Sequence, residues 1–242
     1  PIWENLNGEC NFKFDPKDKG IKEQWYKGEV EFDKKIMVPF PWGSKLSGIN
    51  DEANIGWYKR AIKVPNKWKE KKTFLTIGAS DWETSVWLDG KLLGKHQGGY
   101  IPFSFDLTPY LKYGEVQSLI LRVDDNAGDP NKFKRGYALY GKQGYGNARG
   151  VWQTIYLEAR GQNFLDAVHF TPDIDNKKIN VTTYLENYTT KELPLTVKIK
   201  TENGIIKHNI TVKPGQLKRN FDIYIPEMRL WSLEDPYLYE VE

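Results

Sequence analysis

The feature that most constrains the fold of this chain is a recurring pattern of short strand-like segments joined by tight turns. In the clearest case the apolar runs 86–88 and 92–93 flank the pair Asp89-Gly90. An Asp-Gly pair between two such runs favours a type I′ turn, since both central residues of that turn need positive φ. The same kind of signal recurs at Asn203-Gly204. The sequence therefore predicts an all-β protein that contains antiparallel hairpins.

Two blocks of different strand character meet near residues 159–164. The first block has aromatic-rich strands of irregular spacing, predicted at residues 73–77, 85–88, 118–123 and 151–157. On their own these strands indicate a β-sandwich or a barrel. The second block has short strands of regular alternation, a pattern typical of an immunoglobulin-like sandwich, at residues 179–185, 195–199, 210–212 and 221–225. We therefore predict two domains, residues 1–160 and residues 161–242.

Composition excludes several kinds of partner. The 35 basic and 32 acidic side chains are interleaved, so the small positive excess predicts ordinary solubility and no nucleic-acid interface. No apolar run approaches the length of a membrane span, and no signal peptide is present. The single cysteine, Cys10, cannot form an internal disulfide and is predicted to be a small buried hydrophobe. The compartment stays open: a removed leader is compatible with a first residue Pro1, which slightly favours a secreted or periplasmic location over a cytoplasmic one.

A more specific signal lies between Asp81 and Asp106. This stretch reads D-W-E-T-S-V-W-L-D-G-K-L-L-G-K-H-Q-G-G-Y-I-P-F-S-F-D. It resembles the N-terminal sugar-binding domain of glycoside hydrolase family 2, the family of β-galactosidases and β-glucuronidases. Further matches follow in the family's order, at residues 3–9, 36–40, 57–60, 150–158 and 231–239. The resemblance implies a jelly-roll (galactose-binding-like) sandwich over 1–160, followed by an immunoglobulin-like sandwich over 161–242 that ends within its last strand.

The same resemblance determines what the chain is expected to lack. In this family, hydrolysis is performed by two glutamates on a (β/α)8 barrel that follows the two β-domains. The sequence shows no alternation of strands with long amphipathic helices, and the family's N-x-R-x-x-H-Y-P-like signature is absent. The resemblance thus implies a non-catalytic N-terminal fragment of a family 2 glycosidase. Such a fragment has no catalytic residues of its own and is inactive without the barrel against which it packs.

The candidate substrate-binding residues begin with Asp81 and Trp82. Relatives place an amide or carboxylate side chain here that reaches into the first sugar subsite, and the competing role for Asp81 is a structural turn carboxylate. His96 precedes Gly98-Gly99, which is predicted to form a turn with positive φ. The histidine contacts substrate or barrel, or bonds within its own loop. The other tryptophans are predicted as core, Trp87 and Trp152 among them.

Lys142 and Gln143 complete the candidate set. They lie in the long segment 124–149, where hydrogen-bonding side chains stand beside tyrosines, and the resemblance places this segment on the loop that approaches the barrel. The alternative is a surface loop that only packs against the barrel. The additional acidic residue that relatives carry here is not evident, since Gly144 lies near its place, which puts galactose selectivity and its associated metal site in doubt. No cofactor or metal is predicted, because His169 and His208 lie at no useful ligand spacing from His96.

Three hypotheses of function remain. The leading one is a fragment of a glycosidase that shapes a sugar subsite beside the barrel, which a downstream reading frame for the barrel would distinguish. The second is a free-standing carbohydrate-binding module, and the third a structural or interaction module without sugar affinity. Family frequency ranks β-galactoside first among substrates, ahead of β-glucuronide and β-mannoside. Binding by the isolated chain is expected to be millimolar or weaker, and a homo-oligomer is left open.

Overall fold

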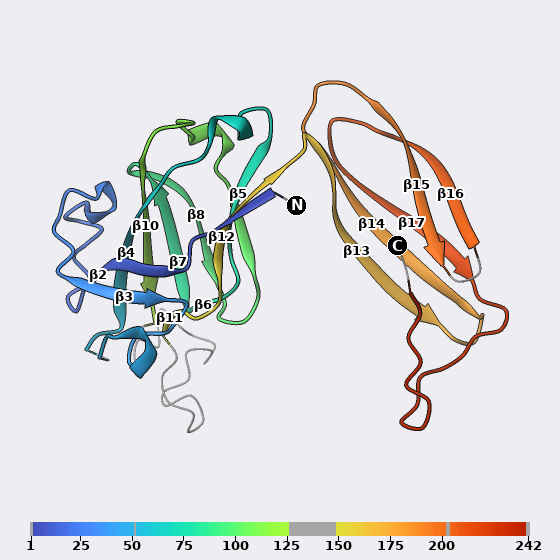
Figure 1. The fold of residues 1–242 in the computed structure, drawn as a ribbon, viewed down its shortest axis with the longest axis horizontal. Coiled ribbons are helices and arrows are strands. Elements are labelled where there is room, and N and C mark those ends of the chain that lie inside the picture. Colours follow the sequence, from blue (N-terminus) through green and yellow to red (C-terminus); the bar gives the residue numbers. More distant parts are fainter. Residues whose placement is uncertain (1, 51, 126–148, 202–203, 241–242) are drawn as a thin grey trace. The chain divides into compact units, whose positions relative to one another are not determined.

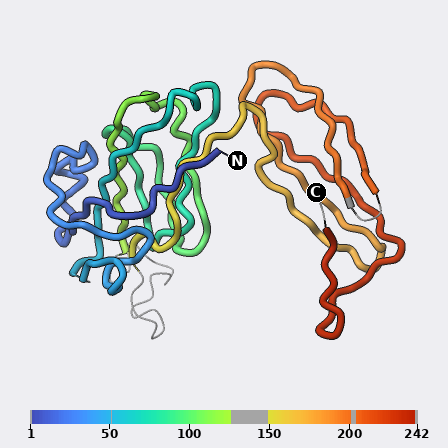
Figure 2. The backbone as a smooth tube through the Cα atoms, viewed as in Figure 1, coloured from blue at the N-terminus to red at the C-terminus, as the bar shows by residue number. Residues whose placement is uncertain are grey.

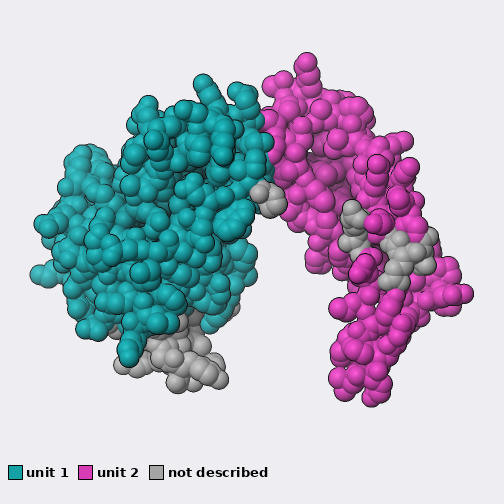
Figure 3. All heavy atoms as spheres, viewed as in Figure 1, with its two compact units in different colours: residues 1–160 teal, residues 161–242 magenta. Residues whose placement is uncertain are grey.

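The computed structural model describes residues 2–50, 52–125, 149–201 and 204–240, and almost all regular structure in them is β-strand (Figure 1). The chain divides into two compact units, Pro1–Arg160 and Gly161–Glu242, coloured separately in Figure 3. Figure 2 follows the backbone through both units, from the blue N-terminal end to the red C-terminal end. The predicted all-β fold is confirmed. Among the described residues, no helix is long and apolar enough to cross a membrane.

Unit 1 is a sandwich of two antiparallel sheets. The larger sheet has the strand order β3 (Lys34–Val38), β2 (Gly8–Phe14), β4 (Ile55–Ile62), β10 (Gln117–Asp124), β7 (Glu83–Leu88) and β8 (Lys91–Gln97). The smaller sheet has the order β1 (Ile2–Asn5), β12 (Ile155–Arg160), β5 (Lys72–Ile77) and β9 (Phe103–Asp106). A short ladder joins β6 (Ser80–Asp81) to β11 (Gly150–Val151). Single 3-10 turns lie at Trp25–Lys27, Lys45–Ser47, Asn66–Trp68 and Thr108–Tyr110.

The space between the two sheets is filled by alternate residues of each strand. In β12, Ile155, Leu157 and Ala159 are buried, whereas the residues between them are only half-buried. This alternation puts one face of the strand in the core and leaves the other at the surface. The largest fully buried side chains of this core are Trp42 and Phe12.

A second apolar cluster covers the other face of the six-stranded sheet. Trp25, Ile55, Trp57, Trp87 and Ile120 pack there, with the Trp57 and Trp87 rings stacked at 5.5 Å. The chain at residues 15–33 closes over them and is anchored by Asp15. That fully buried carboxylate accepts hydrogen bonds from the Lys19 and Gly20 amides and from Nε1 of Trp57, at 2.8–3.1 Å. The central strands of this sheet are therefore buried on both faces.

The hairpin that the sequence predicts at Asp89-Gly90 is confirmed. Strands β7 and β8 pair on either side of it, and both turn residues have positive φ, 46° and 77°. The Asp89 carboxylate accepts hydrogen bonds from the Ser118 amide at 2.8 Å, Nε2 of Gln117 at 3.0 Å and Nζ of Lys112 at 3.1 Å. These bonds tie the hairpin tip to the start of β10. Cys10 is buried as predicted, and burial raises the pKa of its thiol against the opposing effect of the neighbouring Arg60.

Unit 2 is a smaller two-sheet arrangement. One sheet has the order β13 (Asn163–Asp173), β14 (Lys178–Asn187) and β17 (Gly215–Tyr224), and the other pairs β15 (Leu193–Thr201) with β16 (Gly204–Val212). The sheets meet through a buried cluster of five residues, Val181, Ile199, Phe221, Ile223 and Ile225. Many other apolar side chains of this unit remain exposed, among them Leu165, Val168 and Phe170 on β13.

Candidate functional site

Asp81 lies where the two-stranded ladder closes one end of unit 1. In this ladder Asp81 stands opposite Gly150, and Ser80 stands opposite Val151. The Asp81 side chain is buried, with only 5% of the residue exposed, while Trp82 next to it is half-buried. The pairing brings the candidate carboxylate beside the residues at which the long segment 126–148 rejoins the fold.

The turn at Gly98-Gly99 packs directly on Asp81. A Cβ atom at Gly99 would lie 2.8 Å from Cγ of Asp81, so only glycine permits this approach. Gly98 has a φ of +130° and donates its amide to the Trp82 carbonyl at 3.2 Å. The Gly99 carbonyl accepts a hydrogen bond from Nε1 of Trp152 at 2.8 Å. The predicted positive-φ turn is thus confirmed at Gly98, whereas Gly99 is required by the closeness of the carboxylate.

His96 belongs to the same end of the unit. It stands opposite Thr84 in the β7–β8 pair, and its ring stacks on Phe103 with the centroids 4.0 Å apart. Burial lowers the pKa of His96, and the contact with the Gly98 backbone opposes that shift only in part. The lowered pKa favours the neutral imidazole, which lies beside Gly98 and stacks on Phe103.

Asp125 and Arg149, the two residues that flank the long segment 126–148, form a buried ion pair. We call this pair the root of the segment. Nε of Arg149 donates to Oδ2 of Asp125 at 3.2 Å, and the two side chains are 12% and 1% exposed. Both partners are held in turn by the backbone, since the Asp125 amide donates to the Asn54 carbonyl at 2.9 Å and Arg149 bridges to Trp42. Lys142 and Gln143 lie outside the described residues, but the segment that carries them begins and ends at this root.

Gly150, which follows Arg149, is closely surrounded by neighbouring side chains. Its φ is +82°, and a Cβ atom there would lie 2.2 Å from the Tyr58 hydroxyl oxygen and 2.4 Å from the Trp42 ring. The Tyr58 hydroxyl accepts a hydrogen bond from the Val151 amide at 3.2 Å, and burial raises the pKa of Tyr58 far above its usual value. The neutral Tyr58, the buried Trp42 ring and Gly150 therefore set the position of β11 opposite Asp81.

Exposed aromatic surface accompanies these polar groups. Tyr100 is 78% exposed and meets Trp152 edge to face at 6.3 Å. Trp152 is half-buried, so the prediction that it is a core residue is wrong. The same prediction is wrong for Trp3 and Trp231, which are more than half exposed, and is confirmed for Trp87. The indole of Trp152 leaves the core because its N–H reaches the Gly99 carbonyl, 53 residues away in the chain. The sequence pattern showed only a strand-like run at this position.

Three of the five predicted site residues, Asp81, Trp82 and His96, thus meet at one end of unit 1. They surround the turn at Gly98 and Gly99, and Trp152 and Tyr100 add apolar surface to that turn. Carboxylate and carbonyl oxygens beside flat aromatic faces suit a ligand with many hydroxyl groups and some apolar C–H surface. Among the described residues, no three His, Cys, Asp or Glu side chains gather into a set that could hold a metal ion.

Comparison with known families gives matches to both units. Residues 3–127 match the family described as "Glycosyl hydrolases family 2, sugar binding domain", and residues 163–242 match "Glycosyl hydrolases family 2". A β-glucuronidase of Formosa agariphila is 27% identical over 212 residues, which cover 76% of this chain and 21% of the relative. A β-galactosidase of Thermoanaerobacter pseudethanolicus is 24% identical over 99% of this chain and 31% of the relative.

Solved structures agree on the fold. A β-glucuronidase of Bacteroides uniformis superimposes with a TM-score of 0.78 at 21% identity, and the match covers 99% of this chain and 30% of that structure. A β-glucuronidase of Ruminococcus gnavus gives 0.66 at 20% identity, with 99% and 41% covered. The chain therefore spans about a fifth to two fifths of the length of the relatives it matches.

Proposed function

The chain belongs to glycosyl hydrolase family 2, and from this membership we propose that it serves as the non-catalytic N-terminal part of a β-glycosidase. Unit 1 contributes one wall of a sugar subsite, and both units pack against a catalytic barrel that supplies the two carboxylates of a retaining glycosidase. Alone, the chain hydrolyses no glycoside. Its contribution to the reaction is to bind and orient the sugar.

One observation carries the proposal: the close packing of Gly99 on the Asp81 carboxylate. Because Gly99 has no side chain, the backbone of the turn can approach the carboxylate closely. The Asp81 carboxylate, the Gly99 carbonyl and the Trp152 indole therefore lie within one small area. A purely structural turn carboxylate would not need an aromatic pair beside it. Tyr100, which is exposed, and Trp152, which is half-buried, supply that pair.

Each residue has a distinct part in this proposal. Asp81 accepts hydrogen bonds from sugar hydroxyls, and Trp82 supplies apolar surface next to it. His96, neutral and stacked on Phe103, is a positioning residue that holds the Gly98-Gly99 turn. Lys142 and Gln143 are proposed as further hydrogen-bonding groups from the segment that starts at the Asp125–Arg149 root.

The chemistry of Asp81 favours a neutral glycone. A carboxylate accepts hydrogen bonds from hydroxyls but repels the carboxylate of a uronic acid. We therefore rank a β-galactoside first. A β-glucuronide is the second candidate, because several of the matched relatives are named β-glucuronidases. In that case a cationic side chain such as Lys142 must outweigh the repulsion from Asp81.

The two other classes of function make different predictions. A free-standing carbohydrate-binding module binds saccharide tightly without any barrel. A structural or interaction module binds none and associates through its exposed apolar faces. A subsite that offers a few hydrogen bonds, each worth about 0.5–1.5 kcal/mol, binds in the millimolar range because association entropy offsets most of that gain.

The test is a ligand-observed saturation-transfer titration of the 242-residue chain with galactose, glucuronic acid and mannose. We expect saturable transfer to galactose with a millimolar Kd, and a clear reduction of that transfer in Asp81→Asn. Asp89→Asn is the matched control, because it removes a carboxylate charge at the opposite end of the same β7–β8 hairpin.

The outcomes separate the proposals. Saturable transfer that is undiminished in Asp81→Asn contradicts a subsite at Asp81. Absence of transfer to all three sugars at about 0.1 M, well above a millimolar Kd, contradicts the sugar-binding role and leaves a structural module. Transfer that favours glucuronic acid overturns the ranking of the glycone while retaining the subsite.

A further inference from the structure

The outer face of the four-stranded sheet carries an exposed aromatic pair that the proposed function does not use. Trp3 lies on the edge strand β1 and is 55% exposed. Its ring meets the ring of Tyr156 on β12 edge to face, with the centroids 6.3 Å apart. Because side chains alternate along β12, Tyr156 points away from the core that Ile155 and Leu157 enter. An exposed indole on an edge strand has no role in packing of the sandwich interior.

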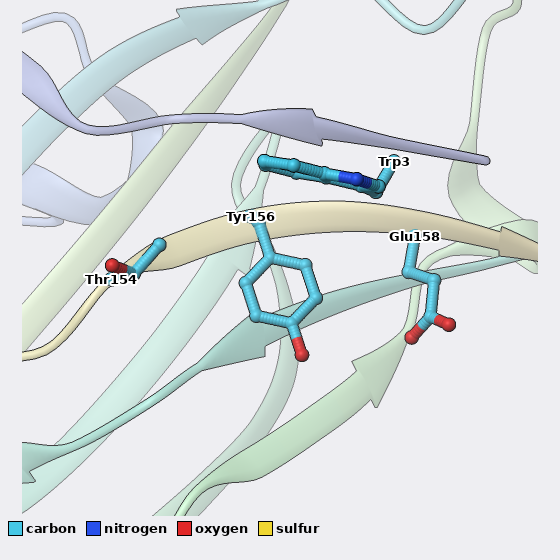
Figure 4. Close-up of a pocket in the computed structure, with 4 residues that line it drawn as sticks. All are labelled: Trp3, Thr154, Tyr156 and Glu158. Carbon is cyan, nitrogen blue, oxygen red and sulfur yellow. The ribbon is translucent and has the colours of Figure 1, made fainter. Parts of the chain in front are cut away.

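A hollow lies beside this pair. It has a volume of about 330 Å³ and is lined by Trp3, Thr154, Tyr156 and Glu158. Figure 4 shows the Trp3 ring above β12, with Thr154 and Glu158 on either side of Tyr156. Ligand pockets generally measure about 300–1,000 Å³, so the hollow fits a short saccharide unit rather than a large ligand.

The polar groups of the hollow are held by their neighbours. Oγ1 of Thr154 accepts a hydrogen bond from Nδ2 of Asn7 at 3.2 Å, so its own O–H can donate outward. Oε2 of Glu158 accepts a hydrogen bond from Nη2 of Arg160 at 2.9 Å, and a carboxylate has capacity for more donors. The hollow thus offers a donor at one end and an acceptor at the other, with aromatic surface between them.

The charges decide what kind of sugar fits. Glu158 is the charged residue among the four that line the hollow. Arg160, a cation on the same face of β12, is paired with Glu158 and lies over the Phe74 ring at 5.0 Å. The Glu158 carboxylate would therefore repel an anionic sugar, and Arg160 would offset little of that repulsion because it is already paired with Glu158. A neutral pyranose meets no such repulsion, and its axial C–H groups suit the electron-rich face of an indole.

We propose that this outer face, centred on Trp3 and Tyr156, is a second carbohydrate-binding site that takes neutral pyranose units of a glycan. The ring of one sugar unit stacks on Trp3, while its hydroxyls bond to Thr154 and Glu158. The site is distinct from the Asp81 cluster and does not rest on the function proposed there. It gives the chain a means of holding a neutral polysaccharide apart from any subsite beside a barrel.

The test follows indole N–H signals in ¹H–¹⁵N spectra of the 242-residue chain during titration with a neutral β-linked glucose or xylose oligosaccharide. Trp231, which is 57% exposed in unit 2, is the matched internal control for Trp3 at 55%. We expect a saturable shift of the Trp3 signal and no shift of Trp231. Affinity, followed in the variant by the backbone amide signals of Tyr156 and Glu158, should fall about tenfold or more in Trp3→Ala, corresponding to the loss of the stacked ring.

Two further variants keep the result interpretable. Ile2→Ala truncates the neighbouring exposed residue of the same edge strand and should leave binding unchanged, which separates loss of the ring from loss of the strand. Asp81→Asn should leave the Trp3 shift intact, so that failure of one site is not mistaken for failure of the other. Equal shifts of Trp3 and Trp231, an equal response to a glucuronic acid oligosaccharide, or no Trp3 shift would each overturn the proposal.

Discussion

Both units of the chain are built from two layers of β-sheet, but they bury their apolar side chains to very different degrees. Unit 1 covers its six-stranded sheet on both faces, with the main core on one side and the Trp25–Trp57–Trp87 cluster on the other. Unit 2 joins its two sheets through a buried cluster of five residues and leaves apolar side chains of β13 at the surface. Burial of apolar surface is the main stabilising contribution to folding, so unit 1 should be the more stable of the two.

This difference in packing corresponds to the different roles that we propose for the two units. The closely packed ends of unit 1 hold fixed groups such as the Gly99 backbone against Asp81, which is what recognition of a small ligand requires. Unit 2 exposes apolar side chains along β13, which suits packing against another domain. The following predictions challenge this contrast, beginning with the largest expected effect.

The largest effect is expected at Gly150 in unit 1. Gly150→Ala should cost about 4 kcal/mol, because overpacking a core costs about 1–3 kcal/mol and a left-handed backbone about 1–2 kcal/mol. The added Cβ would meet the Tyr58 hydroxyl and the Trp42 ring. Urea unfolding followed by tryptophan fluorescence measures the cost, since all nine tryptophans except Trp231 precede residue 161.

Gly8→Ala is the matched control for this prediction. Gly8 also has positive φ, +113°, but an added Cβ there meets nothing within 4 Å. Its cost should be about 1–2 kcal/mol from backbone strain alone. An equal cost for the two variants would mean that the close packing around Gly150 does not contribute to the stability of unit 1.

Removal of a comparable core side chain from each unit compares the two units directly. Ile77→Ala in unit 1 and Ile223→Ala in unit 2 should each cost about 3 kcal/mol, the usual range for truncation of a buried isoleucine. Both residues are at most 3% exposed. We expect unit 1 to stay folded and unit 2 to unfold, because its small core leaves less stability to lose. Hydrogen exchange resolved by unit distinguishes the two results.

If Ile223→Ala left the amides of unit 2 as protected as those of unit 1, the contrast between the two cores would be wrong. Ile77→Val and Ile223→Val serve as conservative controls. Each removes a single methyl group and should cost about 1 kcal/mol.

A pH effect of moderate size is expected at Asp89. Partial burial raises the pKa of this carboxyl, but the hydrogen bonds from Ser118, Gln117 and Lys112 together outweigh that effect and hold the pKa below its usual value. A depressed folded-state pKa gives stability above the unfolded pKa of about 3.9, and that stability is lost as pH falls through the folded value. Asp89→Asn should cost about 1 kcal/mol at pH 7.

The cost of Asp89→Asn should therefore shrink as the pH falls from the unfolded pKa toward the folded pKa of Asp89. Urea unfolding of unit 1 at pH 7 and at about pH 2.5, below the unfolded pKa, measures the difference between wild type and variant. Asparagine tolerates the positive φ of this position, so backbone strain does not confuse the comparison. A difference that is undiminished at the lower pH would contradict the role of the charge.

The smallest effect is expected at a surface pair of unit 2. Nζ of Lys178 lies 3.0 Å from Oδ2 of Asp222, and both groups are accessible to solvent. Exposed ion pairs contribute little because water and salt screen them. Asp222→Asn should leave the unfolding midpoint of unit 2 unchanged within error at both low and high salt. A clear, salt-dependent loss would show that unit 2 depends on surface charge rather than on its core.

The sequence predicted those features that depend on neighbouring residues. The turn at Asp89-Gly90 is local, because the two residues that need positive φ are adjacent and the strands follow directly. The positive φ of Gly98 is local in the same way. The alternation along β14 likewise predicted that Val181 and Leu185 share a face, and both are buried.

The features that were missed depend on contacts between distant parts of the chain. Asp15 anchors the cover of the second cluster by accepting a hydrogen bond from Trp57, 42 residues away. Trp152 leaves the core for a carbonyl 53 residues away, and nothing in its strand-like surroundings signals this. The burial of Asp81 depends on Gly99 and Gly150, which approach it through tertiary structure. The substrate roles of Asp81, Trp82, His96, Lys142 and Gln143 stay predictions.

The measurement that tests the central claim most directly is a protein-observed NMR titration of the 242-residue chain with galactose, with each shift assigned to its residue. Our account predicts that the largest saturable shifts fall on the amides of Asp81, Trp82, His96, Gly98 and Gly99 and on the indole of Trp152, with none in unit 2. These shifts should be clearly reduced in Asp81→Asn and persist in Asp89→Asn. Shifts confined to other parts of the chain, or unchanged by Asp81→Asn, would contradict a sugar subsite at this end of unit 1.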